Sequence, residues 1–217
     1  MPRLTTSISV SLDGYVAGPD PGPEQGLGAG GEKLHEWIYE LASWREMHGR
    51  QGGVRNADSD LLEEQLAATG AIIIGKRMFG GWDGPWGDDP TVGVWGEEPP
   101  FAVPVFVLTH HPRETITVGQ TTFTFVTDGI ESALDQARSA AGDKEVNIGG
   151  GANVIQQYLS AGLLDELQLT VTPVLLGGGV RLLDNLGDTP PEIELTRVVE
   201  SPSGVTHLRY RVANDPR

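Results

Sequence analysis

The sequence predicts a single α/β domain with a central, mixed and mostly parallel sheet, flanked by helices and closed by an antiparallel C-terminal edge. Short apolar runs such as 71–75 and 103–109 are typical of strands buried on both faces of a parallel sheet. These runs alternate with helical patterns, as in βαβ units. Two late segments, 193–199 and 205–212, alternate apolar and polar residues and predict an antiparallel hairpin. We expect one domain over residues 1–217, because a chain of this length suits one core.

The N-terminal part predicts a strand, a turn and a loop. Residues 4–12 alternate apolar and hydroxyl side chains, which indicates the first strand. Asp13-Gly14 then signals a turn, where the simplest role of Asp13 is to cap the backbone. The glycine- and proline-rich residues 19–31 predict a mobile surface loop near a site.

Two helices are expected next. Residues 32–48 carry an apolar stripe at helical spacing, which is typical of a helix that faces a core. A second helix is expected after the capping residues 56–59, and Gly70 is expected to end it. The stripe of the first helix consists of Leu34, Trp37, Ile38, Leu41 and Trp44.

Residues 80–100 are rich in glycine, proline and tryptophan and predict an irregular segment. Its residues Trp82, Trp86 and Trp95 either cover a pocket or anchor a long loop. Further along, strands are expected over 123–127 and 166–176. Between them a helix is expected over 130–141, with Ala133, Leu134 and Ala137 facing inward.

The most specific local signal lies at three consecutive glycines, Gly149, Gly150 and Gly151. A β-prone run over 145–148 precedes them, and a helical pattern that Gly162 would cap follows. Such a turn leaves N–H groups at the positive end of a helix dipole, which suits a phosphate or pyrophosphate. The simpler alternative is that the glycines only make a tight turn. Their spacing fits neither the Rossmann fingerprint nor a P-loop.

Composition excludes several classes of partner. The chain carries 15 Lys and Arg against 30 Asp and Glu, a net charge of −15. Nucleic acid and anionic membranes would repel such a chain, so we expect neither as a partner. The lack of cysteine excludes disulfides and zinc–thiolate sites, and the five histidines show no metal-ligand spacing. With no apolar signal core and no run of membrane-spanning length, we expect a soluble cytoplasmic protein.

Several motifs, in their order along the chain, resemble the dihydrofolate-reductase-like superfamily. The nearest branch is the reductase domain of the bifunctional deaminase-reductase of the riboflavin pathway, together with its stand-alone bacterial relatives. The resemblance covers nearly the whole chain. Its motifs are Ser11-Leu-Asp-Gly-Tyr-Val-Ala17, Ile74-Gly-Lys-Arg-Met-Phe79, Val107-Leu-Thr109, Ile148-Gly-Gly-Gly-Ala-Asn-Val-Ile155 and Pro173-Val-Leu-Leu-Gly-Gly-Gly179.

The resemblance implies a fold that binds NADPH. Hydroxyl and imidazole groups beside the adenosine 2′-phosphate make chemical sense. No acidic residue follows the strands 71–75 and 103–109 to bind a ribose 2′-hydroxyl, so we expect NADPH to be preferred over NADH. The implied cofactor residues are Val16 and Ala17 at the nicotinamide, Gly75, Lys76, Arg77 and Met78 at the phosphates, Thr109, His110 and His111 at the 2′-phosphate, and Gly149, Gly150, Gly151, Ala152, Asn153, Val154 and Ile155 at the pyrophosphate and ribose.

The resemblance departs from folate reductases at the substrate. Those enzymes carry a pterin-binding carboxylate on the first helix, and an alignment on Trp37 places Leu34 at that position, with Glu36 and Glu40 nearby but displaced. We also expect no deaminase domain. The interpretation is an NADPH-dependent reductase of a small, pterin-like or ribosylaminopyrimidine-like substrate, with Asp13 as candidate proton relay. The alternatives are a non-catalytic NADP(H)-binding module and a flavin- or deazaflavin-linked reductase.

We expect the protein to be a homodimer. The strands 166–176 and 205–212 place apolar residues on both faces, and relatives of the resembled fold commonly pair through such edges. The expected partners are therefore a small-molecule substrate and a second copy of the chain.

Overall fold

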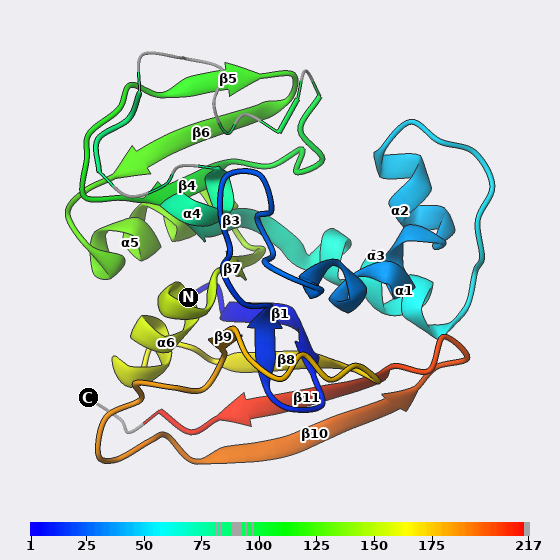
Figure 1. Ribbon diagram of the computed structural model, residues 1–217. Helices are drawn as coiled ribbons and strands as arrows, with labels where there is room; N and C mark the ends of the chain where they lie inside the picture. The colour runs from blue at the N-terminus through cyan, green and yellow to red at the C-terminus, as the bar shows by residue number, and fades with distance from the viewer. Residues whose placement is uncertain (81, 83, 88–92, 94, 97, 215–217) are drawn as a thin grey trace.

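The computed structural model of the protein describes residues 1–80, 82, 84–87, 93, 95–96 and 98–214. Within them, nine strands form one sheet and two short strands form a separate ribbon (Figure 1). The interior strands run parallel, and each edge of the sheet is antiparallel. Across the sheet the strands are β10 (Ile193–Glu200), β11 (Thr206–Val212), β8 (Glu166–Thr172), β1 (Leu4–Ser11), β7 (Glu145–Gly150), β3 (Thr69–Gly75), β4 (Val105–Leu108), β6 (Thr121–Val126) and β5 (Ile116–Val118), and the ribbon pairs β2 (Tyr15–Ala17) with β9 (Val180–Arg181).

The continuous apolar runs lie where the sequence places them, in the interior of the sheet. Ile73 and Ile74 of β3 and Val105 and Val107 of β4 have no exposed surface. Both faces of these strands are covered, so alternation of apolar and polar residues has no advantage there. The late hairpin β10–β11 is also confirmed as an antiparallel edge.

Helices cover both faces of the sheet (Figure 1). On one face, α5 (Ile130–Ala141) and α6 (Ala152–Ser160) pack against the sheet through an apolar core. The inward side chains of α5 are those that the sequence predicts, and burial of its Leu134 stabilises the fold by about 1.5–3 kcal/mol. The other helices are η1 (Gly31–Leu34), α1 (Glu36–Tyr39), α2 (Ala42–Met47), α3 (Ala57–Ala68) and α4 (Lys76–Phe79).

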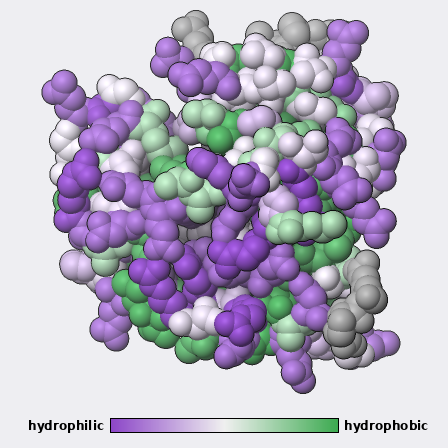
Figure 2. Space-filling model, turned by 180° about the vertical axis from the view of Figure 1, so that it is seen from behind, coloured by the Kyte–Doolittle hydropathy of each residue, from purple (hydrophilic) through white to green (hydrophobic). Residues whose placement is uncertain are grey.

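The outer surface is mostly hydrophilic on the face seen in Figure 2, where apolar residues are scattered among polar ones. This agrees with the large negative charge of the chain. None of the helices within the described residues is long and apolar enough to cross a membrane.

The single helix expected over 32–48 is wrong: η1, α1 and α2 are three short pieces. Leu41 is extended (φ −71°, ψ 139°) and forms a bridge with Val54. The Ala42 N–H donates to the Val54 carbonyl at 3.0 Å, and the Val54 N–H donates to the Glu40 carbonyl at 2.8 Å. These contacts with a later segment replace the helical bonds that the stripe predicts.

Two element ends also differ from expectation. Gly70 lies within β3 and does not end α3, and the position needs glycine because a Cβ there would lie 2.6 Å from the Ala141 carbonyl oxygen. β8 ends at Thr172, short of the expected 166–176, because Pro173 has no N–H and the N–H groups of Leu176 and Gly177 donate to Asp13. The short strands β2, β5 and β9 were not predicted.

The irregular segment predicted over 80–100 lies in part outside the described residues, with gaps at 81, 83, 88–92, 94 and 97. Within the described part, Trp86 packs edge-on against Phe79 and Phe125, and Trp95 packs against Phe101. Both tryptophans anchor the segment to the second, smaller apolar cluster around β4 and β6.

Candidate cofactor and substrate site

The loops after the parallel strands meet along one edge of the sheet, because parallel strands share the side of their carboxyl ends. Asp13 follows β1, Gly151 follows β7, Lys76 follows β3 and Thr109 follows β4. These four strands are neighbours in that order. The motifs predicted to bind the cofactor therefore lie side by side on this edge.

Glycines at the ends of β3 and β7 allow close packing within the predicted cofactor segments. A Cβ on Gly75 would lie 2.9 Å from Val154 Cγ2 of α6. A Cβ on Gly149 would lie 3.1 Å from a side-chain methyl of β3, and one on Gly150 would lie 3.4 Å from Met78 Sδ. These predicted residues hold the turn in place by packing.

The turn itself leaves an open, donor-rich position at the start of α6. Gly150 has φ +127°, the Gly150–Gly151 peptide bond is cis, and Gly151 has φ −80°. No described atom lies within 4 Å of a Cβ built on Gly151, and no side chain caps the helix. The first N–H groups of a helix have no intrahelical partner, so this end of α6, with exposed Asn153 beside buried Ala152 and Ile155, suits an anion.

Basic side chains follow the two neighbouring strands β3 and β4. Arg77 lies just after β3 and His110 just after β4, and both side chains are exposed. Lys76 turns toward Trp86, with Nζ 4.5 Å from the ring centroid and a hydrogen bond to the Gly84 carbonyl. Thr109 Oγ1 accepts a hydrogen bond from the His111 N–H at 3.1 Å, which fixes the start of this loop.

Arg113 is a cation beside this edge that the sequence analysis missed. Its guanidinium lies 4.8 Å from the Trp86 ring, 5.3 Å from Phe125 and 5.6 Å from Phe79. Trp86 Nε1 also donates to the His111 carbonyl at 2.8 Å. Of the two roles considered for Trp86, the structure favours the anchor. Aromatic residues scattered over 79–125 gave no local signal of this cluster.

Asp13 has the contacts of a backbone cap. Its carboxylate accepts from Ser11 Oγ at 2.6 Å, from the Gly177 N–H at 2.7 Å and from the Leu176 N–H at 3.2 Å. The Ser11 hydrogen bond, followed by those amides, lowers the pKa of Asp13 to about 2. Asp13 is therefore ionised near neutral pH and ties the loop after β8 to the turn after β1. Its role as proton relay stays a prediction without support from these contacts.

Val16 and Ala17 are buried in the ribbon β2–β9, where Ala17 pairs with Val180. The chain passes close behind them, since a Cβ on Gly179 would lie 2.1 Å from the Ala17 carbonyl oxygen. The two glycine-rich motifs of the sequence, 11–17 and 173–179, are thus held against each other. Their place near a nicotinamide stays a prediction.

A cavity of about 190 Å³ lies between the sheet and the helices α1 and α3, and sequence reasoning missed it. Its floor is polar, although it belongs to the interior of the sheet. The register pairs Ser7 with Gln168 and Ser9 with Thr170 across β1 and β8, and Thr170 with His207 across β8 and β11. Gly149 also lines the cavity, so the cavity adjoins the glycine turn.

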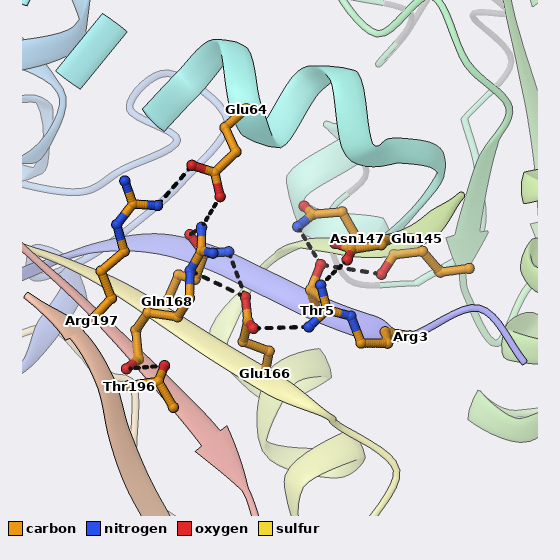
Figure 3. Close-up of polar contacts among 11 residues, drawn as sticks. Arg3, Thr5, Glu64, Glu145, Asn147, Glu166, Gln168, Thr196 and Arg197 are labelled. Atoms are coloured by element: carbon orange, nitrogen blue, oxygen red, sulfur yellow. Dashed lines mark hydrogen bonds and ion pairs between the residues drawn. The ribbon is translucent and has the colours of Figure 1, made fainter. Parts of the chain in front are cut away.

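Ion pairs, more than apolar contacts, hold α3 over this floor. The buried residues of α3 are Asp58 and Ser59, while Leu66 is 38% exposed. Glu64 reaches from α3 toward β10, and its carboxylate lies 2.7 Å from Arg197 and 2.8 Å from Arg209 (Figure 3). Polar side chains of α3 and of the strands face each other here. This region is therefore a cavity with polar walls and not a packed apolar core.

Two side chains from the first helical segment complete the wall. Trp37, expected in the core, is half-buried and donates from Nε1 to Ser9 Oγ at 3.1 Å. His35 Nδ1 is buried and has no hydrogen-bond partner among the described residues. Burial lowers the pKa of His35, so its ring is neutral and Nδ1 is available to a ligand.

The pterin-binding carboxylate of folate reductases has no counterpart on the first helix. Leu34 is fully buried, and Glu36 and Glu40 are exposed. Glu40 pairs with Arg45 at 2.7 Å. The carboxylate in the cavity wall is Asp58 of α3, which has no exposed surface and pairs with His207. The sequence did contain a signal for the polar floor of the cavity. Hydroxyl groups occupy alternate positions of the interior strand β1, at Thr5, Ser7, Ser9 and Ser11.

The sheet order, the antiparallel C-terminal hairpin and the glycine turn before α6 define an α/β domain of the dihydrofolate-reductase-like class. Residues 2–207 match the model of the RibD C-terminal domain, and the chain belongs to that family. Both statements confirm the resemblance drawn from the motifs. Among curated proteins, none matches the chain.

Solved structures share the fold at low sequence identity. A putative riboflavin biosynthesis protein from Shewanella sp. PV-4 is 21% identical, with a TM-score of 0.66 over 97% of this chain and 99% of that one. A diaminohydroxyphosphoribosylaminopyrimidine deaminase/5-amino-6-(5-phosphoribosylamino)uracil reductase from Thermotoga maritima is 13% identical, with a TM-score of 0.57 over 98% of this chain and 57% of that one. Dihydrofolate reductase from Enterococcus faecalis, complexed with NADP(H) and RAB-propyl, is 14% identical, with a TM-score of 0.54 over 98% and 97%.

Proposed function

We propose that this chain is an NADPH-dependent reductase of a small nitrogen heterocycle whose ring occupies the polar cavity. The observation that carries the proposal is the shared wall: Gly149 belongs both to the cavity and to the glycine turn. A ring in the cavity and a dinucleotide on the start of α6 would thus be neighbours. NADP(H) in the complex of the Enterococcus faecalis reductase supports the choice of cofactor.

The volume of the cavity is sufficient for a single ring. A cavity of about 150 Å³ accommodates benzene, and this one is about 190 Å³. Its walls offer both donors and acceptors, from the hydroxyl groups of Ser7, Ser9 and Thr170 and the amide of Gln168. An aminouracil carries matching carbonyl, N–H and amino groups. The reductase from Thermotoga maritima, named for an aminouracil substrate, supports the same class.

In this proposal the cofactor supplies a hydride, and the protein binds the cofactor and the substrate and orients them toward each other. The N–H groups at the start of α6 bind the pyrophosphate, and Gly151 leaves room for it. Arg77, with Thr109, His110 and His111 on the neighbouring loop, would favour the 2′-phosphate. Each well-formed charged contact is worth about 1.5–3 kcal/mol, which predicts a strong preference for NADPH over NADH.

A screen of NADPH oxidation tests the function. We expect turnover with 5-amino-6-(5-phosphoribosylamino)uracil or a related pyrimidine, and little with pterins. Gln168→Leu removes from the floor an amide that also bonds Glu166 and Arg209, and it should raise KM by about fivefold, because a good hydrogen bond contributes about 1 kcal/mol. The matched control is Gln136→Leu, which is exposed on α5 and does not line the cavity.

Other outcomes of the screen would contradict the proposal in different ways. NADPH that binds but reduces no acceptor would indicate a non-catalytic module. Turnover with free flavins or deazaflavins alone would indicate a flavin-linked reductase, and equal use of NADH would remove the role given to Arg77.

A further inference from the structure

A chain of hydrogen bonds joins a buried carboxylate to the wall of the cavity. Asp58 Oδ1 lies 2.7 Å from His207 Nε2, and His207 Nδ1 lies 3.0 Å from Thr170 Oγ1. Asp58 has no exposed surface, and all three residues line the cavity. They come from α3, β11 and β8, and Asp58 and His207 are 149 residues apart. The chain therefore exists only in the folded protein.

The direction of these hydrogen bonds follows from the charge of Asp58. Burial raises the pKa of this carboxyl, but hydrogen bonds from Ser201, His207 and Ser203 outweigh burial and lower the pKa overall. An ionised carboxylate only accepts hydrogen bonds, so His207 must carry a proton on Nε2. The other ring nitrogen, Nδ1, then faces the Thr170 hydroxyl, which can donate to it or accept from it.

The state of His207 decides what Thr170 offers to the cavity. If the ring is neutral, Nδ1 accepts the hydrogen of the Thr170 hydroxyl, and only the hydroxyl oxygen faces a ligand. If the ring is an imidazolium, Nδ1–H donates to Thr170, and the hydroxyl hydrogen is directed to a ligand. A proton taken up by His207 is thus presented to the cavity by Thr170.

We propose that Asp58, His207 and Thr170 form a proton relay that serves the reduction in the cavity, an inference that rests on the proposed reductase function. NADPH, when bound, would supply a hydride to the carbon of a C=N or C=O bond of the substrate. The heteroatom takes the hydrogen of the Thr170 hydroxyl, and Thr170 takes the Nδ1 proton of the His207 imidazolium. His207 becomes neutral, still bonded to ionised Asp58, and solvent returns its proton. The cofactor leaves oxidised and the substrate leaves reduced by a hydride and a proton.

The surroundings of His207 fit this role. The ring of Trp37 packs against its ring, with centroids 5.4 Å apart at 75°, and limits the ring to one orientation. The charged or titratable groups that share the cavity with His207 and Asp58 are His35 beside α1, Arg197 from β10 and Arg209 from β11. Glu64 pairs with both arginines, so Asp58 is not needed to neutralise them. Asp58 also accepts hydrogen bonds from Ser201 and Ser203 at the β10–β11 turn, so it ties α3 to this hairpin while it faces His207.

Nitrogen NMR of the imidazole rings tests the relay without any substrate. In the wild-type protein, neutral His207 should be protonated on Nε2, and it should keep this tautomer in Thr170→Val. In Asp58→Asn the preference should be lost, because an asparagine in such a pair supports the wrong tautomer while keeping the geometry. A wild-type ring protonated on Nδ1 when neutral would overturn the relay.

Kinetics with 5-amino-6-(5-phosphoribosylamino)uracil, or with the best acceptor of the screen, test the chemical role. Thr170→Val should lower kcat by about 100-fold or more, the usual contribution of general acid catalysis, with NADPH affinity unchanged. Thr170→Ser keeps the hydroxyl and should recover most of kcat, whereas a packing role would not distinguish serine from valine in this way. His207→Gln should lower kcat to a similar extent.

The two proposals fail separately. A wild-type kcat retained within about twofold by Thr170→Val overturns the relay and leaves the reductase function standing. A wild-type protein that binds no NADPH overturns the reductase function and with it the chemical role of the relay, whatever the tautomer.

Discussion

The three glycines of the turn before α6 lack side chains for different reasons. Gly149 packs against β3, where a Cβ would crowd its neighbour at 3.1 Å. Gly150 has φ +127°, a backbone conformation that strains any other residue. Gly151 has φ −80°, which other residues also adopt, and open space around its Cβ position. A side chain at Gly151 would therefore probe the ligand without disturbing the fold.

At the scale of this residue, we predict that Gly151→Val weakens NADPH binding by about tenfold or more, equivalent to about 1.4 kcal/mol. The valine would fill the space in front of the helix N-terminus, and Gly151→Ala should have a smaller effect. Calorimetric titration measures the affinity, and thermal unfolding confirms that both variants fold. Wild-type affinity in a folded Gly151→Val variant would mean that the turn is structural only.

At the scale of elements, α3 is the helix that covers the cavity, and a capping box fixes where it begins. The Asn56 side chain accepts from the Asp58 N–H at 3.0 Å and from the Ser59 N–H at 3.2 Å. Ser59 Oγ accepts in return from the Asn56 N–H at 3.4 Å, which completes a capping box. The sequence predicts this cap, because such residues favour helix starts.

We therefore predict that Asn56→Ala lowers the free energy of unfolding by about 1 kcal/mol, the usual effect of losing a cap. A chain of this size should then lose about 2–4 °C in Tm. Asn56→Ser, which can still cap and adds no charge beside the Asp58 carboxylate that the Asn56 amide contacts, is the matched control. Urea unfolding measures both, and equal midpoints for alanine and serine would show that the tertiary contacts of α3 suffice without its cap.

At the scale of the whole molecule, the expected homodimer stays a prediction. The structure indicates a different strand for its interface from those that the sequence suggested. β8 lies between β11 and β1, so it has no free edge, whereas β10 is an edge strand. Apolar residues of β10 are about half exposed: Ile193 at 48%, Leu195 at 51% and Val198 at 51%. An exposed apolar edge strand is a ready surface for pairing with a second copy.

We predict that the protein forms a dimer through β10 at micromolar concentration, with about twice the chain mass of 23.2 kDa in light scattering. Leu195→Asp with Val198→Asp should give monomers, because charges on this face oppose its burial. The matched control is Leu175→Asp, which is 73% exposed and lies outside β10. A monomeric wild-type mass would rule out the dimer.

The sequence by itself determined the elements whose signals are local. The apolar runs of β3 and β4, the inward stripe of α5, the cap at Asn56 and the hairpin β10–β11 all follow from neighbouring residues. The motifs at the carboxyl ends of the strands also indicated the family, which the match over residues 2–207 confirmed. Gly162 ends α6 as expected, with φ 62°.

Only the tertiary structure decided how distant segments complete one another. Val54 breaks the expected helix at Leu41, and the amides of Leu176 and Gly177 occupy Asp13. The cavity and the Asp58–His207–Thr170 chain assemble from strands and helices far apart in sequence. Each of these residues has an ordinary local role, as a cap, a strand hydroxyl or a half-buried ring. Their combination depends on sheet register and helix placement, which no local pattern encodes.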